Sequence, residues 1–173
     1  VSTEEAIRGA GRFLKEGGMH AIKIEGPHLE LAEALTSRGI PVRGHLGLTP
    51  QSVHAMGGYR VQAKSEEAAD RLLADAMALE KAGVFSLVLE GIPAGVAKRV
   101  TESVRVPTIG IGAGPHCDGQ VLVLTDLLGL GEGKYPKFVK PFANLREEIA
   151  RAVRAFADEV EAGTYPDEDH SYR

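Results

Sequence analysis

The sequence predicts an α/β fold built on a parallel sheet, and two features of its pattern lead to this prediction. Short apolar runs, which are typical of strands, alternate along the chain with longer amphipathic runs, which are typical of helices. Such alternation favours parallel strands joined by helical crossovers. In addition, several predicted strands end in polar or charged residues, and parallel α/β folds bind their ligands at that end.

The chain opens with a predicted helix, which is followed by the first strand. Ser2 or Thr3 precedes an acidic first turn, and the apolar spacing stops at Gly17, so we expect a capped helix. Residues 20–26 then alternate between polar and apolar side chains and stop at a glycine followed by a proline, which predicts a strand. The same pair recurs, with helices at 28–39, 65–83 and 94–104 followed by strands at 41–48, 85–92 and 107–114.

The last part of the chain breaks this regular alternation. Residues 120–130 are predicted as a further strand, which enters a loop rich in glycine, proline and lysine. Residues 144–163 have the spacing of a final amphipathic helix. Residues 163–173 are predicted as an irregular C-terminal tail.

Five short strands with polar C-terminal ends favour a (β/α)8 TIM barrel over a doubly wound sheet. A complete barrel has eight strands and about 250 residues. The pattern therefore predicts the last five βα units of such a barrel, in one partial domain over residues 1–173, with three strands expected before the first residue. A five-stranded open sheet of flavodoxin-like order is the alternative that the periodicity leaves open.

Composition and charge argue against several classes of partner. The formal net charge is −4, the pI is near 5.9, and Lys and Arg residues are dispersed, so we expect no nucleic-acid binding. No apolar run approaches the roughly 20 residues that span a bilayer, so we expect no membrane association and no export. The lone Cys117 cannot form an internal disulfide, which fits a reducing cytoplasm.

Lys23 and Glu25 are the first candidate site residues. They lie two positions apart on the strand predicted at 20–26, so their side chains share one face of the sheet. On one interpretation they form a charged pocket, in which Glu25 binds a hard divalent cation and Lys23 holds an anionic substrate. On the other, they are an ion pair that fills the interior of a barrel.

His45 and Glu90 stand near the ends of two further predicted strands. Glycines on both sides of His45 let a ligand or another backbone segment come close, but a lone histidine is often a hydrogen-bonded structural residue. Glu90 ends a strongly apolar strand and is followed by Gly91 and Pro93. A carboxyl group in that position is suited to moving a proton beside a carbonyl, and it is a poor helix cap.

Two glycine-containing loops have both a functional and a structural interpretation. The segment PTIGIGAGPHCDG carries Gly110, Gly112 and Gly114, and a glycine-rich turn there could offer backbone N–H groups to an anion or simply turn the chain. The segment GGYRVQAK, which contains Tyr59 and Arg60, has a composition suited to a flap over a site or to a contact between subunits.

Seven short strings follow one another in an order that resembles the ketopantoate hydroxymethyltransferase family, and the likeness covers essentially the whole chain. The most specific is GHLGLTPQS followed by GGYRVQ. The seven strings are KIEG, GHLGLTPQS, GGYRVQ, LVLEGIP, PTIGIGAG, CDGQVLV and YPKFVK.

The resemblance implies a fold, a reaction and partners. The fold is a barrel of the phosphoenolpyruvate/pyruvate superfamily, assembled as a large homo-oligomer, commonly a decamer, in the cytoplasm. The reaction transfers a hydroxymethyl group from 5,10-methylenetetrahydrofolate to the 2-oxo acid 3-methyl-2-oxobutanoate, which gives 2-dehydropantoate for pantothenate and coenzyme A synthesis. Mg²⁺ chelates the oxo acid and stabilises its enolate.

Carried over by motif, the resemblance implies a role for each candidate residue. Glu25 of KIEG matches a metal ligand, Lys23 a substrate-contacting lysine, His45 a pocket histidine and Glu90 of LVLEGIP the proton acceptor. The aspartate ligands of the family belong to earlier strands, so Glu25 alone cannot complete a six-oxygen magnesium site. Two alternatives stay open: a truncated, non-catalytic barrel fragment, and another magnesium-enolate enzyme of the superfamily, such as a lyase or a phosphonomutase.

Overall fold

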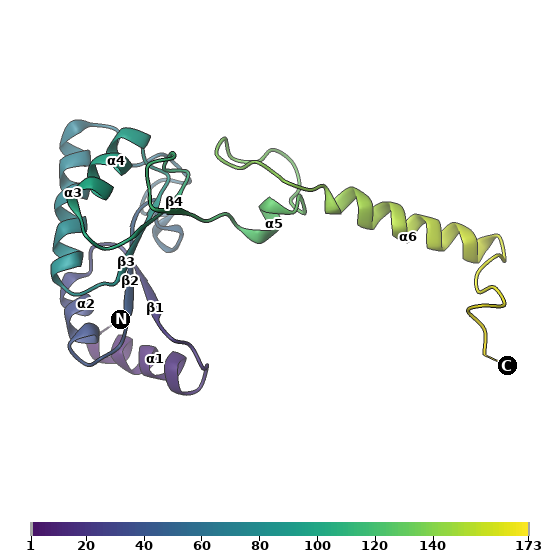
Figure 1. Cartoon of the computed structure of the whole chain (residues 1–173), viewed down its shortest axis with the longest axis horizontal. Coiled ribbons are helices and arrows are strands. Elements are labelled where there is room, and N and C mark those ends of the chain that lie inside the picture. The colour runs from purple at the N-terminus through teal and green to yellow at the C-terminus, as the bar shows by residue number, and fades with distance from the viewer. Residues whose placement is uncertain (1, 173) are drawn as a thin grey trace. The chain divides into compact units, whose positions relative to one another are not determined.

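The computed structural model describes residues 2–172, which form two compact units with their boundary in the chain between Val121 and Leu122. The first unit contains the sheet and helices α1 to α4, and the second contains α5 and α6 (Figure 1). Within the described residues, no helix combines the length and the apolar character that crossing a bilayer requires.

Helices and strands alternate through the first unit as far as β4, as the sequence pattern predicts, and a turn joins β4 to β5. The capped first helix is confirmed, because Ser2 Oγ accepts a hydrogen bond from Glu5 N and the Glu5 carboxylate accepts one from Ser2 N. The elements in chain order are α1 Thr3–Lys15, β1 Ile22–Glu25, α2 Leu29–Thr36, β2 Val42–Gly47, the 3₁₀ helix η1 Pro50–Ser52, α3 Glu66–Lys81, β3 Ser86–Glu90, α4 Ala94–Ser103, β4 Thr108–Ile111 and β5 Gly119–Gln120.

The five strands form one parallel sheet in the order β1-β2-β3-β4-β5. This confirms the predicted α/β fold with a parallel sheet. Each connection moves the chain to the next strand in the same direction, so the order never reverses. The flavodoxin-like alternative is therefore wrong, because its order reverses at a switch point.

The core of the first unit lies between the sheet and helices α2, α3 and α4, which cover one face of the sheet (Figure 1). Side chains alternate along a strand, and Ile24, Leu46 and Leu89 point to this helix-covered face. The helices contribute Ala32, Leu35, Leu72, Ala76, Leu79, Ala97 and Val100. The polar residues at odd positions of β1 and β2 therefore point to the opposite face.

The second unit contains the short helix α5 Leu124–Leu127 and the long helix α6 Leu145–Glu161. The helix predicted at 144–163 is thereby confirmed, and residues 163–172 form turns. The strand predicted at 120–130 is wrong: β5 ends at Gln120, and the following apolar run turns into α5. A short apolar run does not distinguish strand from helix by its periodicity.

Candidate active site

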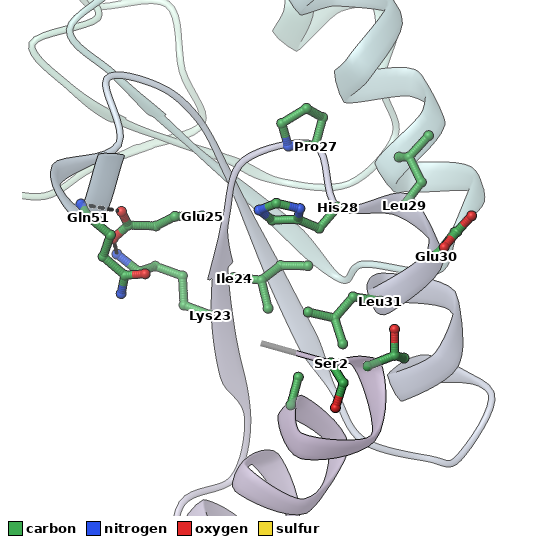
Figure 2. A pocket seen from close by; sticks show the side chains of 12 residues that line it. Ser2, Lys23, Ile24, Glu25, Pro27, His28, Leu29, Glu30, Leu31 and Gln51 are labelled. Atoms are coloured by element: carbon green, nitrogen blue, oxygen red, sulfur yellow. Dashed lines mark hydrogen bonds and ion pairs between the residues drawn. The ribbon is translucent and has the colours of Figure 1, made fainter. Parts of the chain in front are cut away.

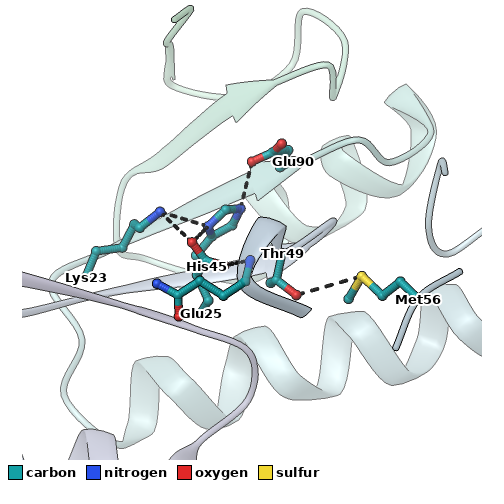
Figure 3. A network of polar contacts seen from close by, with 7 residues as sticks. Lys23, Glu25, His45, Thr49, Met56 and Glu90 are labelled. Carbon is teal, nitrogen blue, oxygen red and sulfur yellow. Dashed lines mark hydrogen bonds and ion pairs between the residues drawn. The ribbon is translucent and has the colours of Figure 1, made fainter. Parts of the chain in front are cut away.

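The four candidate residues come together at the carboxyl ends of three neighbouring strands (Figure 3). Lys23 and Glu25 lie on β1, His45 lies on β2 and Glu90 ends β3. The strand register sets this arrangement, because Glu25 stands opposite His45 and Gly47 stands opposite Glu90. All four side chains point to the face of the sheet that helices α2, α3 and α4 leave uncovered.

Gly47 lets the ends of β2 and β3 approach each other. Its φ is +91°, and a Cβ atom built there would lie 2.2 Å from the carbonyl oxygen of Glu90. Only glycine combines this backbone conformation with so close a contact. The prediction that a glycine beside His45 admits another backbone segment is confirmed.

Lys23 connects Glu25 with His45. Its ammonium group lies 3.0 Å from Glu25 Oε1 and 3.3 Å from His45 Nδ1. An ammonium group can only donate, so this contact makes Nδ1 the acceptor and leaves the proton of a neutral imidazole on Nε2. Lys23 is half exposed, whereas the side chains of Glu25 and His45 are almost fully buried.

His45 presents its other ring nitrogen to Glu90. Nε2 lies 3.1 Å from Glu90 Oε2, yet their orientation does not satisfy hydrogen-bond geometry. Among the described residues, the buried Nε2 therefore has no hydrogen-bond partner. An unsatisfied buried donor costs free energy, so a small reorientation of Glu90, or a ligand oxygen that takes the place of the Glu90 carboxylate oxygen, would stabilise it.

Glu25 is held as a carboxylate by its neighbours. Burial by itself would raise its pKa, but hydrogen bonds from the Gln51 N–H and the Lys23 ammonium group, together with the charge of Lys23, outweigh burial. The net result is that the pKa of Glu25 lies below its ordinary value. Glu25 is therefore a permanent negative charge beside His45 at neutral pH.

A cavity of about 700 Å³ adjoins this group along β1, the edge strand of the sheet (Figure 2). Lys23, Glu25 and Gln51 line one part of it, and Figure 2 shows Gln51 next to the Glu25 carboxylate. The volume lies within the range of small-molecule sites. The arrangement can hold a small anion near Lys23 and exchange a proton through Glu90 or His45.

The candidate site provides only part of a ligand set for the magnesium ion that the resemblance implies. Within residues 2–172, no three His, Cys, Asp or Glu side chains come together as a metal-binding group. Both oxygens of Glu25 already accept hydrogen bonds, one from Lys23 and one from Gln51. Magnesium prefers six oxygen ligands, so the described residues do not form a complete magnesium site.

One contributor to the site leaves no signal in the sequence pattern, whereas a charged residue on the same face of β2 does leave one. The backbone N–H of Gln51 donates to Glu25 Oε2 at 3.0 Å, and backbone donors leave no mark in a sequence. Arg43 shares the face of His45, since it lies two residues before it, and its Nε donates to Ser86 Oγ at 2.9 Å. The two-residue spacing alone could have identified Arg43.

The glycine-rich turn after β4 has the features of a structural turn. Asp118 accepts hydrogen bonds from both the N–H and the hydroxyl group of Thr108, which closes the turn. Gly114 has a φ of +77°, and a Cβ atom there would lie 2.3 Å from that of Ala94. Cys117 is partly buried against this turn.

Comparison with known proteins decides the family. The family model described as ketopantoate hydroxymethyltransferase matches residues 1–168. The chain belongs to the ketopantoate hydroxymethyltransferase family. It is 56% identical to the 3-methyl-2-oxobutanoate hydroxymethyltransferase of Syntrophus aciditrophicus over 99% of this chain, and 58% identical to that of Thermobifida fusca over 98%.

The match covers nearly all of this chain but only part of each of these two family members. The chain spans 64% of the length of the Syntrophus aciditrophicus protein and 61% of the Thermobifida fusca protein. Among solved structures, a chain of the Amycolatopsis orientalis BexX/CysO complex has a TM-score of 0.52 at 15% identity, covering 96% of this chain and 67% of that chain. At this identity the likeness concerns the fold alone.

Proposed function

We propose that this chain carries the proton-transfer part of an active site that moves a hydroxymethyl group from 5,10-methylenetetrahydrofolate to 3-methyl-2-oxobutanoate. The product would be 2-dehydropantoate, formed in the cytoplasm for pantothenate and coenzyme A synthesis. The observation that carries the proposal is the buried His45, which has Lys23 and Glu25 at one ring nitrogen and Glu90 at the other. The similar family members are named 3-methyl-2-oxobutanoate hydroxymethyltransferases, which supports hydroxymethyl transfer to this oxo acid, whereas the folate donor and the product are proposed from the family resemblance.

Lys23 is the residue we assign to the carboxylate of the oxo acid. Its side chain is half exposed and lines the cavity along β1. A carboxylate placed there gains a charge-assisted hydrogen bond, and the carbonyl and C3 then extend toward His45 and Glu90. Glu25 keeps the ammonium group in position at 3.0 Å.

Glu90 is the residue we assign to the proton at C3. The C3–H bond breaks, its proton passes to a Glu90 carboxylate oxygen, and the electron pair becomes the enolate of the oxo acid. The side chain of Glu90 is largely buried, so few water molecules compete for the proton. The Nε2–H of His45, which lacks a partner, can donate to the enolate oxygen or to Glu90.

Magnesium stays part of the proposal, with Glu25 as one ligand. The remaining ligands would have to come from residues outside 2–172, because the described residues lack a complete set. No step is assigned to the ion. Folate is likewise proposed as the one-carbon donor.

A (β/α)8 barrel and a homo-oligomer complete the proposal. The barrel is supported by the unreversed strand order, by helices on one face of the sheet and by site residues at the carboxyl ends of strands. We also propose that the protein assembles as a homo-oligomer. The family resemblance implies that this assembly is a decamer. Native mass spectrometry of the purified protein measures the number of copies directly.

Turnover with both substrates tests the proposed reaction. The purified protein is incubated with 3-methyl-2-oxobutanoate, 5,10-methylenetetrahydrofolate and MgCl₂, and 2-dehydropantoate is measured by mass spectrometry. Product that depends on the folate supports hydroxymethyl transfer, whereas lysis or phosphoryl rearrangement without folate would support another enolate enzyme. Absence of every such activity would favour the non-catalytic fragment.

A further inference from the structure

The loop between β2 and α3 is tied to the candidate site at three points. Leu48 N donates to the carbonyl oxygen of Glu90, and Gln62 N donates to that of Gly91, both at 2.8 Å. Between these anchors, Gln51 N donates to the Glu25 carboxylate. Residues 48–62 therefore begin and end at the carboxyl end of β3 and contact β1 on the way.

The tip of this loop carries an aromatic ring and a cation toward solvent. Tyr59 is 77% exposed, and Arg60 beside it is exposed as well. None of the ion pairs among residues 2–172 includes Arg60. Gly57 and Gly58 precede them with φ values of +70° and +105°, and both have open space around the position of a Cβ atom.

The charge of this part of the chain is one-sided. The protein has 24 Asp and Glu residues, yet none occurs between Glu33 and Glu66. The same segment contains the cations Arg38, Arg43, Arg60 and Lys64. An acid-free loop around Arg60 provides no internal partner for its guanidinium group, which leaves it available for an external anion.

Arg60 is close enough to the site to contact a molecule bound there. It lies two residues before Gln62, so its Cα is within about 7 Å of the Gln62 Cα, and the backbone N–H of Gln62 is hydrogen-bonded to Gly91. Gln62 Nε2 also donates to the carbonyl oxygen of Arg60 at 2.8 Å, which fixes the backbone between them. The long side chain of Arg60 then extends beyond this fixed point.

We infer that Arg60 binds the glutamyl carboxylates of the folate donor and that the Tyr59 ring packs against its aromatic part. This inference rests on the proposed function and adds the residues that select the second substrate. A reduced folate has both features that the loop tip can recognise, an extended aromatic ring system and a carboxylate-bearing tail. Guanidinium groups match carboxylates in a bidentate manner, and exposed tyrosine rings offer a flat apolar surface.

Two ligands that differ only in the tail test the assignment. Isothermal titration of the full chain compares tetrahydrofolate with tetrahydropteroamide, which has the same rings and ends in a neutral amide in place of the glutamate. We expect the wild type to bind tetrahydrofolate about tenfold more tightly, as a charge-assisted contact provides. Arg60→Gln should reduce this ratio to about one, and Arg60→Lys should keep part of it.

Two further variants separate the roles of charge and ring. Arg38→Gln removes a cation of the same acid-free segment that lies between α2 and the amino end of β2, away from the carboxyl ends of the strands, and should keep the tenfold ratio. Tyr59→Ala should weaken both ligands equally and leave the ratio unchanged. Arg60 is exposed, so its variants should unfold at the same denaturant concentration as the wild type.

The outcomes distinguish this inference from the proposed function. A wild-type ratio that Arg60→Gln leaves intact would overturn the role of Arg60 while folate binding stands. A wild type that binds neither ligand would overturn both the inference and folate as the donor. Equal binding of both ligands by the wild type would overturn the carboxylate contact alone.

Discussion

His45 Nε2 lies 3.1 Å from Glu90 Oε2 without forming a hydrogen bond, and this nitrogen is buried. The two residues are brought together by the parallel pairing of β2 with β3, in which Gly47 stands opposite Glu90. The other ring nitrogen of His45 accepts from Lys23. A proton on Nε2 therefore lies next to a carboxylate, and a small change in orientation would let it donate to that carboxylate or to a substrate oxygen.

Replacement of Lys23 should weaken binding of the oxo acid. Lys23→Met removes the ammonium group that contacts Glu25 and His45 and keeps a side chain of similar length. Loss of a charge-assisted hydrogen bond should raise the KM for 3-methyl-2-oxobutanoate about 10- to 100-fold. Steady-state kinetics with the oxo acid varied at saturating folate measures this change.

The matched control for this variant is Lys98→Met on α4, where the exposed Lys98 lies 3.8 Å from Glu102. Its KM should equal that of the wild type. An unchanged KM in Lys23→Met would remove Lys23 from the substrate-binding residues.

Glu25 should make the stability of the protein depend on pH in the acid range. Its pKa in the folded protein lies below the ordinary value of 4.5, so the unfolded state binds this proton more readily. The stabilisation is complete above about pH 4.5 and is lost as the pH falls through the lower, folded pKa. Glu25→Gln lacks the carboxylate, so its difference in free energy of unfolding from the wild type should shrink between about pH 6 and pH 3.

Urea unfolding followed by circular dichroism at a series of pH values provides these free energies. Glu33→Gln on α2, an exposed carboxylate outside every ion pair of the described residues, is the control and should show no such trend. A constant difference between Glu25→Gln and the wild type across the range would contradict the account of Glu25.

A side chain at Gly114 should lower the stability of the protein, because the first residue of α4 lies directly against this position. Its φ is +77°, and a Cβ atom would lie 2.3 Å from Ala94 Cβ. Gly39 has nearly the same φ, +76°, but nothing lies within 4 Å of a Cβ atom there. Both Gly→Ala changes carry the same backbone strain, so their difference isolates the clash with Ala94.

We expect Gly114→Ala to lower the free energy of unfolding by about 1–3 kcal/mol more than Gly39→Ala. Urea denaturation of the two variants under the same conditions measures this difference. Equal stability of the two variants would show that the turn after β4 moves away from α4 without cost.

Much of the fold follows from the sequence because each element has a local signal. The capping residues around Ser2 and the regular apolar spacing predict the helices, and the alternation of strand with helix over most of the first unit predicts the parallel sheet. The error at residues 120–130 has a physical cause. A short run of Val and Leu suits a strand or a buried helical turn equally, and only tertiary contacts decide.

The residues of the candidate site are also predictable in part, because they too have a local signal in the sequence. The sequence identifies four candidate residues because polar side chains near the end of a predicted strand are unusual. These residues are Lys23, Glu25, His45 and Glu90. Their mutual distances depend on the strand register, which Gly47 permits and which no local pattern reveals. The Gln51 N–H contact with Glu25 is a backbone interaction and is invisible in the sequence.

Exchange of the C3 proton of 3-methyl-2-oxobutanoate with D₂O tests the central claim, that Glu90 removes this proton beside His45. Proton NMR follows the loss of the C3–H signal in the presence of the protein and Mg²⁺, without folate. The wild type should catalyse exchange, and Glu90→Gln should slow it about 10²- to 10⁴-fold, whereas Glu102→Gln on α4 should not. Exchange by Glu90→Gln at the wild-type rate would contradict the assignment.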